Sequence, residues 1–292
     1  MPRTIDEGFR DFLAKLTPSD SESVAAKNHR ASIEACLKTN FGLNRFFRTG
    51  SFGNGTSISG YSDVDYFASI PSSRLSWNSS YALTQVREAL NRRFYSTDVY
   101  VDCPAVVCPF GSDAKESTEV VPARDIGKIG RINYITYEIP DCSGGWRHSS
   151  PEAHNAYVRA VDQKLNGRVK PLIRFIKAWK CYRNVPISSF YLELRIAKYA
   201  EGESIIIYDR DVHRVFSHLF NVKLAQMQDP MGISGYIKAC ATEAKLNDAW
   251  SKLSTALSRS EQAIAAKDKG NISTAFSWWN LIYDGNFPGY YR

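Results

Sequence analysis

Two aspartates alternate with apolar residues in one short segment, and this segment restricts the possible folds more than any other. Asp63 and Asp65 stand at positions i and i+2 in the run Ser62-Asp63-Val64-Asp65-Tyr66-Phe67. Because side chains alternate between the two faces of a strand, both carboxylates point to the same side, about 7 Å apart along the backbone. The run therefore predicts a strand from Asp63 to Ile70 that carries a metal-binding edge.

A glycine-rich segment precedes this strand. It begins with Gly50-Ser51 and continues as Phe52-Gly53-Asn54-Gly55. It lacks the lysine of a P-loop, so it predicts a small turn whose amides and Ser51 hydroxyl bind phosphate oxygens. A phosphate-binding turn beside paired carboxylates favours nucleotidyl transfer, in which two divalent cations hold the attacking hydroxyl and the triphosphate.

A two-metal site of this kind needs a third carboxylate on a neighbouring strand. Asp102, in the run Val99-Tyr100-Val101-Asp102-Cys103, alternates with apolar residues. Glu119 opens a second apolar run, Thr118-Glu119-Val120-Val121-Pro122-Ala123. Spacing alone does not decide between the two residues.

Composition suits a globular enzyme. The chain has 292 residues, of which 43% are hydrophobic, and a formal net charge of +7. This length supports one bilobal unit or two closely packed domains. The basic excess suits polyphosphate ligands, but it is too diffuse to indicate activation by nucleic acid. Since no apolar run approaches the roughly 18 residues of a membrane span and the first residues lack a signal-peptide core, we expect a cytoplasmic protein without membrane contact.

The six cysteines stand singly along the chain, without a C-x-x-C pair. This spacing predicts neither a structural zinc site nor a disulfide framework. Cys142 and His148 lie close in sequence, but no second pair of metal ligands accompanies them.

Hydrophobic periodicity predicts an α+β chain. Two helices come first, the second of them long and ending near Thr39, and helices dominate again after Ser150-Pro151. We place a boundary near residue 145, between a nucleotidyltransferase core with N-terminal helices (1–145) and a helical nucleotide-binding lobe (146–292). The other expected elements are a helix at Thr84–Phe94, β-rich stretches at Val99–Phe110, Thr118–Ala123 and Ile132–Ile139, and helices at Val169–Cys181, Ser188–Ala200 and Ile237–Ala266.

Several segments resemble a known group of enzymes. Gly50-Ser51 with Asp63-Val64-Asp65 resembles the nucleotidyltransferase signature of the polymerase-β superfamily. Further segments are similar to the bacterial relatives of cyclic GMP-AMP synthase and oligoadenylate synthase, the CD-NTases. They are Glu119–Ala123, Pro171–Lys180, Pro186–Glu193 and Asn286–Pro288, and the resemblance extends roughly from Phe41 to Pro288.

The resemblance implies a fold and a set of site residues. The fold would be a polymerase-β-like core, a mixed sheet with helices, followed by a C-terminal helical lobe, with the active site in the cleft. The third acid would be Glu119, where many members carry aspartate. Asp63, Asp65 and Glu119 would then be the catalytic carboxylates and hold two Mg²⁺ ions, with Mn²⁺ as the alternative. The triphosphate would contact Gly50, Ser51, Lys177 and Ser189.

The resemblance also implies an activity. Nucleoside triphosphates would condense into a cyclic di- or trinucleotide with release of pyrophosphate, and a downstream effector would sense this second messenger in bacterial anti-phage defence (CBASS). The alternatives are a template-free synthase of linear oligonucleotides, a toxin-type nucleotidyltransferase that modifies a macromolecule, and a non-catalytic nucleotide-binding protein. The bases joined, the linkage and the activating trigger stay open at this point.

Overall fold

The computed structural model describes residues 2–18, 20–61, 64–111, 117–129 and 133–291, and for residues 20–27 it describes the backbone alone. The chain divides into two compact units. The sheet unit comprises Pro18–Ala156 and Met231–Ser234, and the helical unit comprises Met1–Thr17, Tyr157–Pro230 and Gly235–Arg292. One of the points at which the chain passes between the units, Ala156 to Tyr157, falls within helix α5 (Pro151–Lys164).

The sheet unit confirms the expected mixture of helices and strands. Its elements are α2 (Asp20–Phe41), β1 (Arg45–Arg48), α3 (Gly50–Asn54), β2 (Val64–Ser69), the 3₁₀ turn η1 (Ser72–Arg74), α4 (Ser79–Arg93), β3 (Tyr100–Asp102), β4 (Ala105–Cys108), β5 (Thr118–Asp125), β6 (Tyr137–Pro140) and β7 (Trp146–Ser149). Strand β7 belongs to the sheet although it follows residue 145.

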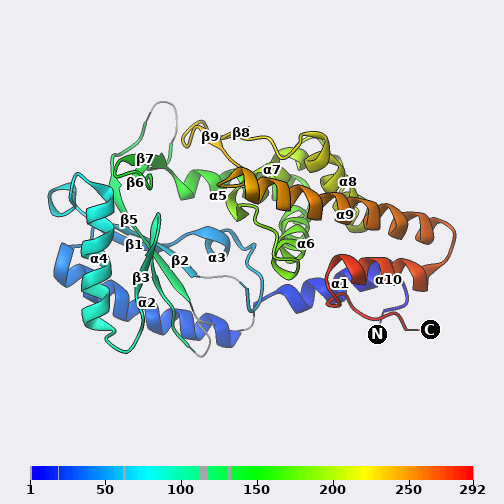
Figure 1. Ribbon diagram of the computed structural model, residues 1–292, viewed down its shortest axis with the longest axis horizontal. Coiled ribbons are helices and arrows are strands. Elements are labelled where there is room, and N and C mark those ends of the chain that lie inside the picture. Colours follow the sequence, from blue (N-terminus) through cyan, green and yellow to red (C-terminus); the bar gives the residue numbers. More distant parts are fainter. Residues whose placement is uncertain (1, 19, 62–63, 112–116, 130–132, 292) are drawn as a thin grey trace. The chain divides into compact units, whose positions relative to one another are not determined.

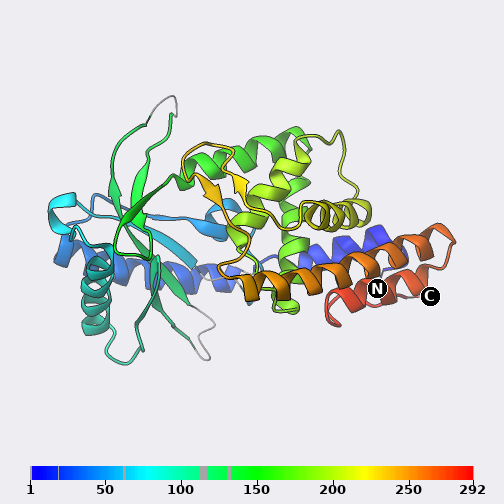
Figure 2. The same cartoon turned by 45° about the horizontal axis from the view of Figure 1, so that its top comes forward.

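Within the described part of the chain, a mixed sheet of seven strands organises this unit (Figure 1). Five strands follow the order β1-β2-β5-β4-β3, and β2 and β5 run parallel while the other neighbours are antiparallel. Strand β5 continues beyond β4 and pairs there with β6, which pairs in turn with β7 (Figure 2). The parallel pair β2–β5 therefore lies inside the sheet, with a partner on each side.

The two faces of the sheet bury different side chains. Val64 and Tyr66 of β2 pack into an apolar core with residues of α2 and α4, such as Leu37 and Val86. Phe67, one position further along β2, belongs to a second cluster on the opposite face. This alternation assigns each residue of β2 to one face of the sheet.

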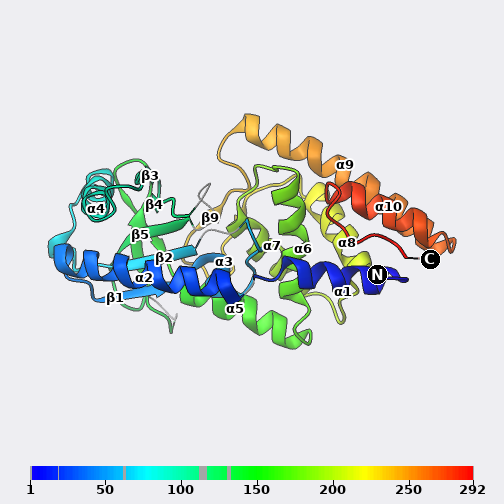
Figure 3. The ribbon, with the colours of Figure 1, turned by 90° about the horizontal axis from the view of Figure 1, so that it is seen from below.

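The helical unit contains the remaining elements. They are α1 (Ile5–Leu16), the larger part of α5, α6 (Val169–Tyr182), α7 (Ser189–Ala200), α8 (Tyr208–Asn221), β8 (Met227–Gln228), β9 (Tyr236–Ile237), α9 (Glu243–Asp268) and α10 (Ile272–Ile282). Helices α9 and α10 lie side by side (Figure 3). Throughout the described residues, no helix is both long enough and apolar enough to cross a bilayer.

An aromatic cluster fixes the N-terminal helix in this unit. The ring centroid of Phe9 lies 5.0 Å from that of Phe175 and 5.0 Å from that of Trp279. Phe12 stands 4.5 Å from Tyr283. The rings on α1 are fully buried, as the helical spacing of the apolar residues predicts. Helix α1 thus packs with elements from the far end of the sequence.

The long C-terminal helix begins later than expected. The sequence predicts Ile237–Ala266, but Ile237 pairs with Met227 in the small β8–β9 sheet, so the predicted start is wrong. The hydroxyl of Thr242 accepts the N–H of Lys245 and caps α9 at this point. A local cap, rather than the apolar pattern, sets the start of the helix.

One disulfide was not expected from the sequence. Cys103 and Cys142 are bonded, with their Cα atoms 5.7 Å apart. The two cysteines are 39 residues apart, so their spacing carries no signal for pairing. The sheet brings the turn after β3 close to the loop after β6, and the prediction that the cysteines form no disulfide is therefore wrong for this pair.

Candidate active site

The glycine turn packs directly against one of the two aspartates. Thr49, after β1, donates its backbone N–H to the carbonyl of Asp65 at 2.8 Å. Gly50 follows with φ of +56°, a left-handed conformation that glycine adopts without strain. A Cβ atom at Gly50 would lie 1.7 Å from the carboxylate oxygen Oδ2 of Asp65. No side chain fits there, so the turn and the carboxylate form one compact site in the sheet unit.

The predicted turn is the start of a short helix. Helix α3 has five residues, and Gly55 ends it in a left-handed conformation. The carbonyl of Ser51 accepts the N–H of Thr56 at 2.8 Å. The Ser51 hydroxyl is half-buried and has no hydrogen-bond partner within the described residues. Ser51 thus follows the glycine that contacts Asp65, with its hydroxyl available to a ligand.

A second carboxylate lies beside Asp65. Glu119 is its register partner on the parallel strand β5. The next residues that share their face, Phe67 and Val121, belong to the apolar cluster opposite α2 and α4. Asp65 and Glu119 therefore stand on that same face, on strands about 4.8 Å apart, and both are half-buried. Asp63 lies outside the described residues.

The alternative third acid lies farther away. Asp102 is exposed on the outer strand β3, where it pairs with Ala105. Strands β4 and β5 stand between β3 and β2. Of the two candidates, the register brings Glu119 next to Asp65.

The donor set suits a hard divalent cation. Magnesium takes oxygen ligands and completes its shell with water and phosphate oxygens, so a few carboxylates suffice. Asp65 and Glu119 offer such oxygens from neighbouring strands. No cluster of three or more metal-ligating side chains occurs among the described residues, a set to which Asp63 does not belong. The pair fits a cation that shares its remaining ligands with a substrate.

In the helical unit, the lysine expected to bind phosphate is buried. Lys177 is 2% exposed in the middle of α6. Its ammonium donates to the Oε1 atom of Glu193 on α7 at 2.7 Å. The neighbours Ile176 and Ala178 are also buried, so this part of the helix is enclosed on most sides.

A different lysine contacts the predicted serine. Lys180, three residues further along α6, donates its ammonium to the Ser189 hydroxyl at 3.0 Å. Both residues are half-buried, and Ser189 is the first residue of α7, after the N-cap Ser188. Lys180 was not predicted from the sequence as a neighbour of Ser189. The only sign of it in the sequence is that Lys180 stands three residues after Lys177 on the same predicted helix, at the end of its apolar stripe.

The strand order and register, together with the helices around the sheet, form a mixed α+β fold that is also found in the solved structure of E. coli MS115-1 CdnC. Residues 3–162, more than half of the chain, match the model of the Second Messenger Oligonucleotide or Dinucleotide Synthetase domain (SMODS). The chain therefore belongs to the SMODS family.

Known proteins agree with this assignment. A probable cyclic nucleotide synthase of Bacillus cereus (strain VD146) is 27% identical over 178 residues, which are 59% of this chain and 52% of that protein. The chain thus spans about half the length of that relative. The cyclic AMP-AMP-AMP synthase of Acinetobacter sp. (strain ATCC 27244 / 9458) is 23% identical over 313 aligned positions, covering 98% of this chain and 86% of the relative.

Solved structures confirm the fold. The structure of E. coli MS115-1 CdnC with ATP has a TM-score of 0.74 and 17% sequence identity, and the match covers 97% of this chain and 98% of CdnC.

Proposed function

We propose that this chain is a nucleotidyltransferase that joins nucleoside triphosphates into a cyclic di- or trinucleotide and releases pyrophosphate. The observation that carries the proposal is the pairing of Asp65 with Glu119 on parallel strands, with the Gly50 turn packed against Asp65. Membership of the SMODS family supports it, because the family is described by the synthesis of second-messenger oligonucleotides or dinucleotides.

The carboxylates have a defined part in this proposal. Asp63, Asp65 and Glu119 would hold two Mg²⁺ ions, with Mn²⁺ as the alternative. Bound there, the cations would lower the pKa of the attacking hydroxyl and stabilise the leaving pyrophosphate. The Ser51 hydroxyl and the Gly50 amide bind and orient the donor triphosphate. At Gly50 the backbone lies so close to the Asp65 carboxylate that an added Cβ would clash with it.

In the helical unit, Lys180 and Ser189 form the phosphate-binding pair. A lysine ammonium and a serine at the first turn of a helix both suit phosphate oxygens, and they already lie 3.0 Å apart. We assign the phosphate contact to Lys180 in preference to Lys177, whose charge is neutralised by Glu193 inside the protein. The predicted role of Lys177 stays untested until its variants are measured.

The relatives point to adenine nucleotides among the substrates. The Acinetobacter relative is named for a product of three adenylates, and the CdnC structure contains ATP. ATP is therefore the first triphosphate to test. We further propose that the product is a second messenger for an effector protein in anti-phage defence, and that the enzyme acts in the cytoplasm.

The test is product formation from labelled nucleotides. The purified chain is incubated with all four ribonucleoside triphosphates and Mg²⁺, then treated with phosphatase, and the product is identified by mass spectrometry. A cyclic product retains its phosphate label, whereas a linear oligonucleotide loses the terminal phosphates. Label on protein or RNA would instead indicate a toxin-type enzyme.

A pair of variants tests the carboxylate. Asp65→Asn should lower turnover by at least about a hundredfold, because the metal loses a charged ligand. Asp102→Asn makes the same chemical change on the exposed strand β3 and should leave turnover within about twofold of wild type. Equal turnover in wild type and Asp65→Asn would show that this carboxylate does not serve the reaction.

A further inference from the structure

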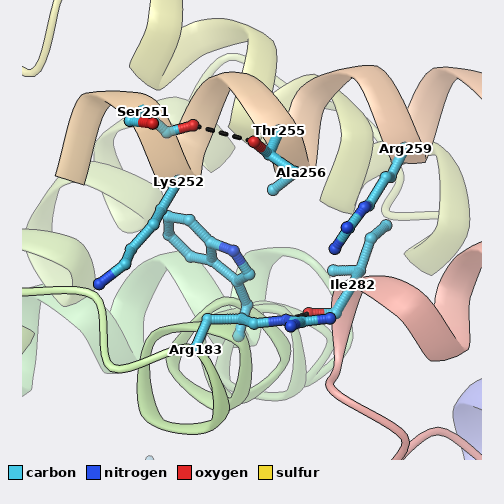
Figure 4. A pocket seen from close by; sticks show the side chains of 8 residues that line it. Arg183, Ser251, Lys252, Thr255, Ala256, Arg259 and Ile282 are labelled. Carbon is cyan, nitrogen blue, oxygen red and sulfur yellow. Dashed lines mark hydrogen bonds between the residues drawn. The ribbon is translucent and has the colours of Figure 1, made fainter. Parts of the chain in front are cut away.

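A pocket of about 260 Å³ opens in the helical unit where α6, α9 and α10 meet (Figure 4). Arg183 lines it from the end of α6, and Ile282 from the last turn of α10. The wall from α9 runs along one face of that helix, from Ser251 through Ala256 to Arg259. None of these residues belongs to the candidate active site.

Of the described residues, three with cationic side chains line this pocket and none with an acidic side chain does. Lys252 and Arg259 are seven residues apart on α9, two turns along the same face, and Arg183 faces them from α6. The two guanidinium groups meet at one acceptor. Arg259 donates to the carbonyl of Leu281 at 2.8 Å, and Arg183 donates to the same oxygen. Two like charges are thus held close together at the rim of one cavity.

The surrounding carboxylates leave this charge incompletely balanced. Asp284 pairs with Arg183 at 2.8 Å and Asp248 pairs with Lys252 at 2.8 Å, while no carboxylate of the described residues is paired with Arg259. A guanidinium has five N–H donors, and within the same set of residues Arg259 uses one, toward Leu281. Arg183, Lys252 and Arg259 together thus carry more positive charge than the two paired carboxylates balance, and Arg259 has N–H donors without an acceptor among the described residues.

Burial and repulsion act together on Arg259. Burial lowers the pKa of its guanidinium, the nearby Arg183 lowers it further, and Asp284 opposes both. Placing positive charges together in a partly desolvated pocket costs free energy that a bound anion would recover.

We propose that this pocket binds a small phosphate-bearing anion of about the size of pyrophosphate. Arginine side chains bind phosphate oxygens through paired N–H groups, and Lys252 adds a point charge. The buried side chains Trp179 and Ile282 form an apolar floor that excludes water from one side of the ligand. The volume lies just below the roughly 300–1,000 Å³ of pockets for drug-sized ligands, which suits a small anion rather than a whole nucleoside triphosphate.

The test is calorimetric titration of the full chain with pyrophosphate, at constant ionic strength and with EDTA to remove divalent cations. The protein carries Lys180→Ala and Ser189→Ala, which remove the phosphate-binding pair proposed for the helical unit. Arg259→Gln in this background should weaken binding by about tenfold or more, as expected for the loss of charge-assisted hydrogen bonds. Lys245→Gln removes one charge from an exposed position on the same helix and should not change the affinity.

A second variant, Ser251→Asp, tests the pocket without removing a side chain that the fold uses. Ser251 is exposed at the rim, and its backbone carbonyl, not its side chain, accepts the Thr255 hydroxyl at 3.1 Å. The new carboxylate removes no internal contact but repels an anion, so affinity should again fall about tenfold. Glutarate, a dicarboxylate, should bind more weakly than pyrophosphate.

Four outcomes overturn the proposal. They are the absence of saturable pyrophosphate binding in this background, unchanged affinity in both Arg259→Gln and Ser251→Asp, an equal loss of affinity in Lys245→Gln, and glutarate binding as tight as that of pyrophosphate. None of these measurements depends on turnover, so the proposed nucleotidyltransferase activity stands or fails separately.

Discussion

Gly50 shows how one missing side chain lets the backbone lie against a carboxylate of the candidate site. Replacing it with alanine would place Cβ inside the Asp65 carboxylate, in a left-handed conformation that alanine adopts only with strain. We expect Gly50→Ala to displace Asp65 and to lower turnover by about a hundredfold, since a shift of about 1 Å in a reacting group has effects of that order. Steady-state assay of the product and urea unfolding measure the two effects.

Gly42→Ala is the matched control. Gly42 has φ of +68°, but a Cβ there meets nothing within 4 Å. The variant should lose about 1–2 kcal/mol of stability through backbone strain alone, with turnover unchanged. If both alanine variants lose activity in proportion to their loss of stability, close packing against Asp65 is not the reason that Gly50 is glycine.

Helices α6 and α7 are joined by a buried ion pair, which predicts different roles for two lysines. Lys177→Met would leave Glu193 buried without its cation and should cost about 3–5 kcal/mol of stability. Lys177→Met with Glu193→Leu removes both charges and should recover most of that loss. If Lys177 is structural, this double variant also regains turnover.

Lys180→Ala provides the contrast on the same helix. Lys180 is half-buried and donates to Ser189, so its loss should cost about 1 kcal/mol of stability while the KM for ATP rises. If the double variant Lys177→Met with Glu193→Leu is stable yet inactive, the result supports the predicted contact between Lys177 and phosphate. Urea unfolding and KM measurements on the three variants decide between the lysines.

Across the whole molecule, local patterns predict local structure and leave distant pairings open. The alternation of aspartates with apolar residues predicts the strand that carries Asp65, and the Gly50-Ser51 pair predicts the turn beside it. To prefer Glu119 over Asp102 as the third acid, one must know the order of the strands, and no single segment of sequence gives that order. In the sequence analysis, only the resemblance to a family favoured Glu119. The Cys103–Cys142 bond likewise depends on the closure of the sheet.

The burial of Lys177 and the late start of α9 were not apparent from the sequence, and their physical causes are related. A lysine on an amphipathic helix is normally solvated, but α6 is enclosed on most sides at Lys177, and periodicity within one helix does not reveal what covers it. The signal was the partner, Glu193, which stands between two leucines on α7. The late start of the long helix has a similar cause. Thr242 caps α9, so the helix begins at Glu243 although the sequence before it was predicted to be helical.

The stability of the helical unit should depend on pH through a partly buried histidine. The ring nitrogen Nδ1 of His213 lies 2.9 Å from the Ser260 hydroxyl. Burial lowers the pKa of His213 below its ordinary value of 6.5; Arg210 and Arg214 lower it further, and Glu261 opposes them. Below pH 6.5 the unfolded chain therefore binds a proton more readily than the folded one. Stability contributed by the neutral ring is present above this pH and decreases as the pH falls toward the folded pKa.

His213→Asn removes this titration and tests its sign. Urea unfolding of wild type at about pH 7.5 and about pH 5.5 should show a loss of stability at the lower pH, and the variant should lose less, by at most about 1.4 kcal/mol, the value of one pH unit. Some dependence will persist, because burial also lowers the pKa of His218 on the same helix. Equal losses in wild type and His213→Asn would mean that the imidazole of His213 titrates alike in the folded and unfolded chain, contrary to its burial between α8 and α9.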